Sequence, residues 1–145
     1  MNAERNKEYG IALLRISLGV MFIAHSVVLK QFTFTLAGTA GYFESLGLPG
    51  LLAYVVFGME AVGGILLVLG VRTREVAAAL IPILVGAFWV HAGNGWVFSN
   101  AGGGWEYPLY LIVLSGAQVL LGEGAFALSR TTVSRERGTA GHATA

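Results

Sequence analysis

Residues 48–69 read LPGLLAYVVFGMEAVGGILLVL and carry one charged side chain, Glu60. Pro49 stands where the first turn of a helix tolerates proline, and Gly70 stands where helices commonly end. A run of this length matches the roughly 20 residues that cross a hydrocarbon core about 30 Å thick. We therefore expect a transmembrane helix over residues 48–70.

Three more apolar runs follow the same pattern, at residues 11–30, 76–92 and 107–122. The first is interrupted by Arg15, and the second contains Pro82, which should kink a helix. The last is the shortest of the four. The chain is therefore predicted to be all-α, a four-transmembrane-helix bundle.

The composition agrees with a membrane protein. Of the 145 residues, 55% are hydrophobic and 12% are charged, and the mean hydropathy is +0.70. A soluble domain of this size could not bury so much apolar material. A net charge of +1 offers no attraction for nucleic acid. The absence of cysteine excludes thiol–disulfide exchange and thiolate-held iron–sulfur clusters.

A signal peptide is an alternative interpretation of the first run, because Arg5 and Lys7 precede it. No A-x-A-like cleavage site follows Leu29, and three more apolar runs do. We therefore favour a retained membrane helix.

Basic residues predict the orientation, because cytoplasmic loops carry an excess of Lys and Arg. The loops 31–47 and 93–105 contain neither. The other side holds Arg5, Lys7, Arg72, Arg74, Arg130, Arg135 and Arg137. Both termini should therefore face the cytoplasm, in the inner (plasma) membrane of the cell.

The segments outside the helices divide in three. Residues 1–10 form a cytoplasmic N-terminus, and residues 129–145 are polar and without periodicity, which predicts a disordered cytoplasmic tail. Within 31–47, apolar residues at helical spacing end at Gly47. They predict a short helix lying in the interface, or a re-entrant cap. The membrane domain spans residues 11–128.

Two charges lie in the interior of the apolar runs, Arg15 and Glu60, whereas Lys30 stands at the end of the first run. An isolated charge at the bilayer centre costs at least roughly 2.5 to 3.5 kcal/mol, so an inward-facing partner is expected. Because the first two helices are antiparallel neighbours, we expect Arg15 and Glu60 to form an ion pair. Such a pair could fix helix packing, or it could bind a ligand or handle protons.

A second polar group should lie near the outer surface and contains His25, Lys30, His91, Asn94 and Glu106. Each lies at or near the outer end of a predicted helix. If they converge, they form a polar mouth that could orient a quinone-like head group or relay protons. The alternative is that each residue only caps a helix end or reaches to the interface.

Metal and haem binding have weaker support. His25 and His91 could serve as axial haem ligands or join Glu106 around a metal ion. However, these residues lack the local spacing of a known metal motif, and no Cys-x-x-Cys-His is present. We therefore predict no metal site and no intrinsic cofactor, consider haem disfavoured, and keep quinone as the candidate ligand.

In order and spacing these residues resemble the DoxX family over about residues 11–128. The shared pieces are Leu14-Arg15, His25, Lys30, Leu46-Gly47-Leu48-Pro49, Glu60, Gly63-Gly64, Leu69-Gly70-Val71-Arg72-Thr73-Arg74, His91-x-x-Asn94-Gly95, Glu106-Tyr107-Pro108-Leu109 and Gly122-x-Gly124. One departure is Ser26, where the family usually has glycine.

The resemblance implies a supporting role in membrane redox chemistry, because the family is named for a membrane subunit of a thiosulfate–quinone oxidoreductase. The leading hypothesis is a membrane subunit or accessory of a quinone-linked oxidoreductase. In it, the polar residues bind a ligand or handle protons. The alternatives are a non-catalytic scaffold or assembly factor and a small-molecule transporter. Besides the lipid bilayer, the expected partners are a redox protein or further copies of the chain, and catalysis by the chain itself is left open.

Overall fold

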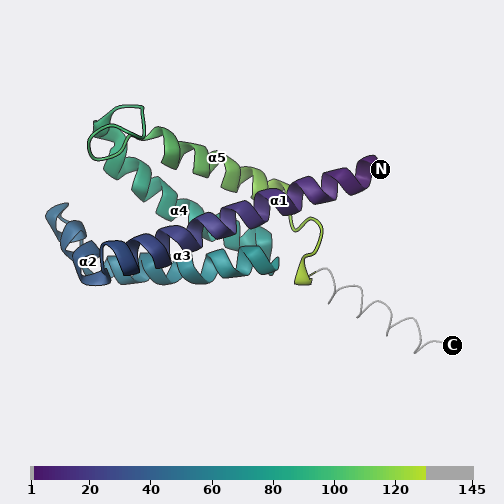
Figure 1. Ribbon diagram of the computed structural model, residues 1–145, viewed down its shortest axis with the longest axis horizontal. Coiled ribbons are helices and arrows are strands. Elements are labelled where there is room, and N and C mark those ends of the chain that lie inside the picture. The colour runs from purple at the N-terminus through teal and green to yellow at the C-terminus, as the bar shows by residue number, and fades with distance from the viewer. Residues whose placement is uncertain (1, 130–145) are drawn as a thin grey trace.

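The structure is a computed structural model that describes residues 2–129, and within them the chain is all-α without a strand (Figure 1). The elements are α1 (Ala3–Ile23), the π-helix η1 (Ala24–Thr33), α2 (Leu36–Ser45), α3 (Leu51–Leu69), α4 (Thr73–His91), the 3₁₀ turn η2 (Ala92–Asn94) and α5 (Glu106–Leu121). Apart from its first residue, the predicted disordered tail lies outside the described residues.

Three helical stretches in the described part of the chain are long and apolar enough to cross a membrane: Ala3–Thr33, Leu51–Leu69 and Thr73–Asn94. The fourth apolar helix, Glu106–Leu121, is shorter. Large apolar side chains point outward along these helices, including Leu13, Val62 and Leu120, which are 69%, 58% and 78% exposed. Such surfaces suit contact with lipid, and the chain is a membrane protein.

The helices pack as two pairs, with α1 along α3 and α4 along α5. In Figure 1 the two pairs cross and then separate toward the side that holds α2 and the loop between α4 and α5. We call this side the loop end. The opposite side, where α3 ends and residues 122–129 follow α5, is the strap end, and residues 122–129 are the strap.

Glycine lets the first pair approach closely. A Cβ atom at Gly19 would lie 2.7 Å from the carbonyl oxygen of Gly64, so neither helix can accept a larger residue at this contact. Small residues at helix contacts are typical of membrane proteins. The apolar core consists of Leu18, Phe22, Leu67, Ala77, Leu80, Leu84 and Leu111.

Several residues that signal helix starts, ends or bends in the sequence can be located in the structure. Gly70 has a φ of +70° and ends α3, and α2 is the short helix expected in the first loop, followed by Gly47 with a φ of +79°. Pro82 lies inside α4, which continues through it. The main difference concerns the first helix. It was predicted to begin at residue 11, but in the structure it begins at Ala3 and continues beyond Ile23 as a π-helix.

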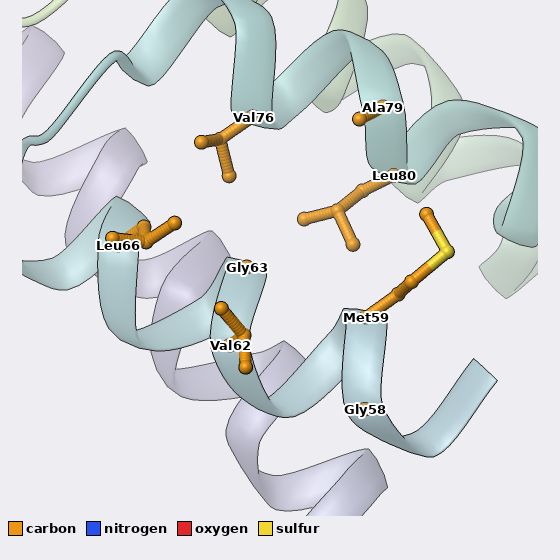
Figure 2. Close-up of a pocket in the computed structure, with 8 residues that line it drawn as sticks. All are labelled: Gly58, Met59, Val62, Gly63, Leu66, Val76, Ala79 and Leu80. Carbon is orange, nitrogen blue, oxygen red and sulfur yellow. The ribbon is translucent and has the colours of Figure 1, made fainter. Parts of the chain in front are cut away.

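An apolar groove of about 360 Å³ runs between α3 and α4. Figure 2 shows its lining, which consists of Gly58, Met59, Val62, Gly63, Leu66, Val76, Ala79 and Leu80. Every lining residue is apolar or glycine, so the groove lacks a polar side chain that could orient a ligand.

Candidate functional site

Glu60 pairs with Lys30. The Lys30 Nζ atom donates to Glu60 Oε2 at 2.5 Å, and the two side chains are 17% and 7% exposed. The pair joins η1 to α3. The expected Arg15–Glu60 ion pair is therefore wrong, although the expectation that Glu60 faces an opposite charge is confirmed.

The distance along the helices explains the error. Arg15 packs against Gly70, at the end of α3. Glu60 lies ten residues earlier on that helix, about 15 Å away along its axis at 1.5 Å per residue. Lys30, at the far end of the helical run from α1 into η1, lies at the depth of Glu60. Glu60 lies near the middle of α3, whereas Arg15 lies at the level of Gly70, so antiparallel packing does not bring the two side chains to the same depth.

The π-helix determines which side chains face Glu60. In an α-helix a side chain five residues on points about 140° away, because each residue turns the helix by about 100°. In a π-helix the backbone bonds residue i to i+5, so His25 and Lys30 lie close to one turn apart and on one side. η1 thus brings both residues toward α3. π-helical segments are rare and frequently mark functional sites.

The His25 ring is held on two sides. Its Nδ1 atom lies 3.0 Å from the Met21 carbonyl oxygen, so Nδ1 carries the proton in the neutral ring and Nε2 is left as an acceptor. The ring stacks on Tyr107 of α5 at a centroid distance of 5.6 Å. When protonated, the His25 ring would attract the Glu60 carboxylate. His25, Lys30, Glu60 and Tyr107 therefore form one group, which we call the Lys30–Glu60 cluster.

Tyr107 was missed as a site residue in the sequence analysis. It lies next to the predicted site residue Glu106, but nothing in the sequence indicated which of the two would face the first helix. The tyrosine faces His25, and the glutamate bonds to the loop. A stacking partner becomes visible only once α5 is placed against η1.

Asn94 and Glu106 hold the loop between α4 and α5. The Asn94 Nδ2 atom donates to the carbonyl oxygens of Gly102 and Gly103 at 3.0 and 2.9 Å. Glu106 Oε1 accepts from the backbone N–H of Phe98 at 2.9 Å. Both side chains bond to backbone groups of the loop itself, so they shape the loop.

His91 lies against the same loop. Its Nδ1 atom is 2.7 Å from the Ala87 carbonyl oxygen. A Cβ atom at Gly103, whose φ is +77°, would lie 3.0 Å from His91 Cδ2. The ring therefore packs beneath the loop, as part of the same group as Asn94 and Glu106.

The structure thus divides the predicted polar mouth into two groups. His25 and Lys30 belong to the Lys30–Glu60 cluster, whereas His91, Asn94 and Glu106 support the loop. Between the two groups, residues 2–129 show no hydrogen bond or ion pair. Nor do these residues bring together three or more His, Asp or Glu side chains that could hold a metal ion.

Arg15 occupies a separate place at the strap end. It is fully buried, and its Nη2 atom donates to the carbonyl oxygen of Ala125 at 3.0 Å. Arg15 therefore lies outside the Lys30–Glu60 cluster.

Comparison with known proteins places these motifs in a family. The DoxX family model matches residues 10–93. A Bacillus subtilis (strain 168) protein named "Putative oxidoreductase CatD" is 39% identical over 80 residues, which are 55% of this chain and 58% of that protein. An uncharacterized protein of Haemophilus influenzae is 37% identical over 129 residues, 88% of this chain and 93% of its own. No solved structure is significantly similar. With most of its length matched in this way, the chain belongs to the DoxX family.

Proposed function

We propose that this protein is an integral membrane subunit or accessory of a quinone-linked oxidoreductase system. The Lys30–Glu60 cluster is its ligand-binding or proton-handling site. The observation that carries the proposal is the buried ion pair between two helices of a strongly apolar chain. Ionisable groups at such positions are costly and usually serve a pathway, relay or ligand. The DoxX family and the name of the Bacillus relative support an oxidoreductase association.

The proposed topology is a bundle of four transmembrane helices, α1–η1, α3, α4 and α5. Both termini face the cytoplasm in the inner membrane. The supporting observations are the lack of Lys and Arg in loops 31–47 and 93–105, and the apolar composition of α5. The Lys30–Glu60 cluster then lies toward the outer half of the membrane.

The cluster offers both kinds of group that a quinone needs. Among the described residues, Lys30 Nζ donates one hydrogen bond, to Glu60, and Glu60 accepts it with one of its two carboxylate oxygens. The remaining Lys30 N–H groups can donate to a quinone carbonyl, and Glu60 Oε1 and His25 Nε2 can accept from a quinol hydroxyl. Reduction of a quinone to a quinol consumes two electrons and two protons. In this proposal a partner oxidoreductase supplies the electrons, while the cluster orients the ligand and exchanges protons with it.

A second candidate function, a membrane scaffold for a partner protein, is favoured by the loop between α4 and α5. Trp96 and Phe98 are 52% and 67% exposed at its surface. Exposed aromatic residues on a shaped loop suit a protein contact, and they also suit the membrane interface. A scaffold would need this loop and would not need the Lys30–Glu60 pair.

Quinone binding tests the proposal. Purified protein in detergent is titrated with a short-chain ubiquinone and with a short-chain menaquinone while tryptophan fluorescence is followed. The parent should bind at least one of them saturably, and Glu60→Gln should weaken that binding at least about tenfold, equivalent to about 1.4 kcal/mol. Glu75→Gln is the matched control, because Glu75 is an exposed carboxylate paired with Arg72 on the surface. Absence of saturable binding, or equal binding by Glu60→Gln, would overturn the proposal.

A further inference from the structure

The strap ties the ends of two helices together. The backbone N–H of Ala125 donates to the Glu8 carbonyl oxygen on α1 at 3.0 Å. The backbone N–H of Ser129 donates to the carbonyl oxygen of Gly70, the residue at which α3 ends, and the distance is 3.2 Å. The backbone N–H of Arg72 in turn donates to Ser129 Oγ at 3.0 Å. The strap therefore bridges α1 and the end of α3 through backbone bonds.

Two glycines let the strap lie close to the helices. A Cβ atom at Gly124, whose φ is +67°, would lie 2.7 Å from the Ala12 backbone nitrogen. A Cβ atom at Gly70 would collide with Arg15 Nη1 and with Ala127 of the strap. The contact leaves no room for larger residues at either position, so it is a closely packed interface.

Arg15 lies at the centre of this contact. It is fully buried, and its one hydrogen bond among the described residues goes to the strap carbonyl of Ala125. Its Nε and Nη1 atoms have no hydrogen-bond partner there. Glu123, also in the strap, attracts the guanidinium electrostatically. A buried arginine needs such compensation, so releasing the strap would leave the charge with neither group.

We infer that Arg15 is a positioning residue that holds the strap across α1 and α3 and thereby fixes the axial register of the two helices. The inference rests on the proposed function in treating the Lys30–Glu60 pair as the working site. Helical residues run without interruption from Ala3 to Thr33, so a shift of α1 at Arg15 is carried to Lys30, further along the same helical run. A slip of one residue moves Lys30 by about 1.5 Å, enough to break its hydrogen bond to Glu60.

Reaction of Glu60 with an apolar carbodiimide reports the register. In native membranes dicyclohexylcarbodiimide activates a carboxyl group in apolar surroundings. If Lys30 is in contact, its amine attacks the activated carboxyl and forms a Lys30–Glu60 amide with loss of the urea. If Lys30 is displaced, the activated group rearranges to an N-acylurea on Glu60. Mass spectrometry of the digested protein gives the ratio of the two products.

The parent should give mainly the Lys30–Glu60 amide, and Arg15→Leu should lower the ratio of amide to N-acylurea several-fold. Arg15→Lys, which can still donate to Ala125, should recover part of it. Arg5→Leu is the matched control, an exposed arginine on the same helix, and should match the parent. Gly124→Ala keeps Arg15 but pushes the strap from Ala12, so it should also lower the ratio; it serves as the second variant if Arg15→Leu fails to fold.

A cross-link separates release of the strap from the loss of register. Tyr9 and Phe126 stack at a centroid distance of 5.7 Å, and the chain has no cysteine, so Tyr9→Cys with Phe126→Cys can be joined by a short bifunctional thiol reagent without background. Cross-linking the Arg15→Leu protein should restore the parent ratio. If Arg15→Leu and Gly124→Ala leave the product ratio of the protein without cross-link unchanged, whether or not they lower the yield of this cross-link, the inference is overturned. Failure of quinone binding by the parent would overturn only the proposed function, because the product ratio is measured without quinone.

Discussion

The loop end and the strap end of this molecule provide different partners for a buried basic side chain. At the loop end, Lys30 meets the carboxylate of Glu60 beside His25, and the lysine remains partly exposed. At the strap end, Arg15 is fully buried and is held by a backbone carbonyl. A pair of ionisable groups can exchange a proton or receive a polar ligand, whereas an arginine bound to the backbone keeps its charge and fixes a segment. Lys30 and Arg15, two basic residues of the same predicted helix, therefore have different roles.

Removing one member of the buried pair should have the largest effect. Lys30→Leu leaves the Glu60 carboxylate buried without its counter-charge, and breaking a buried pair costs about 3 to 5 kcal/mol. The melting temperature in detergent should fall markedly. The double variant Lys30→Leu with Glu60→Leu should regain much of the loss, because it leaves no buried charge. A Lys30→Leu protein as stable as the parent would show that the pair contributes little.

Loss of the Arg15 bond should have an intermediate effect. A hydrogen bond to a charged group contributes about 1.5 to 3 kcal/mol, so Arg15→Leu should lower the melting temperature by less than Lys30→Leu does. Limited proteolysis should also cut the strap faster in this variant. If the strap of Arg15→Leu resists protease as well as that of the parent, Arg15 does not hold the strap.

The stacking of His25 on Tyr107 should contribute less. Aromatic pairs contribute about 0.5 to 1.5 kcal/mol beyond the area they bury. Tyr107→Leu should therefore destabilise the protein slightly and weaken quinone binding, while Tyr107→Phe, which keeps the ring, should retain both. Tyr110→Leu is the control, because Tyr110 is 61% exposed on the same helix. Equal quinone binding by the two leucine variants would remove Tyr107 from the cluster.

Substitutions among the residues that support the loop, His91, Asn94 and Glu106, should have the smallest effect on the Lys30–Glu60 cluster. Asn94→Ala removes two hydrogen bonds to the loop, each contributing about 0.5 to 1.5 kcal/mol, so protease should cut the loop between α4 and α5 more readily. Quinone affinity should stay within about twofold of the parent, since distant sites act independently. A large loss of affinity in Asn94→Ala would restore the single polar mouth predicted from the sequence.

Sequence patterns predicted the helices better than they predicted the contacts between side chains. Apolar run lengths and Gly70 indicated the helices, because these signals are local. The partner of Glu60 could not be predicted, because it depends on the π-helix that turns Lys30 toward α3. The role of Arg15 depends on a backbone carbonyl of the strap. Every residue has such a carbonyl, so the sequence cannot indicate which one binds Arg15. Gly122-x-Gly124 was visible as a motif, but only the approach of Gly124 to Ala12 gives it a physical reason.

Exchange of the two charges tests the central claim most directly. In Lys30→Glu with Glu60→Lys the ion pair is reversed but kept, so the melting temperature should lie well above that of either single reversal. The matched exchange, Arg15→Glu with Glu60→Arg, should give no such recovery, because those residues are not in contact. Recovery by the Arg15 exchange, or none by the Lys30 exchange, would contradict the account.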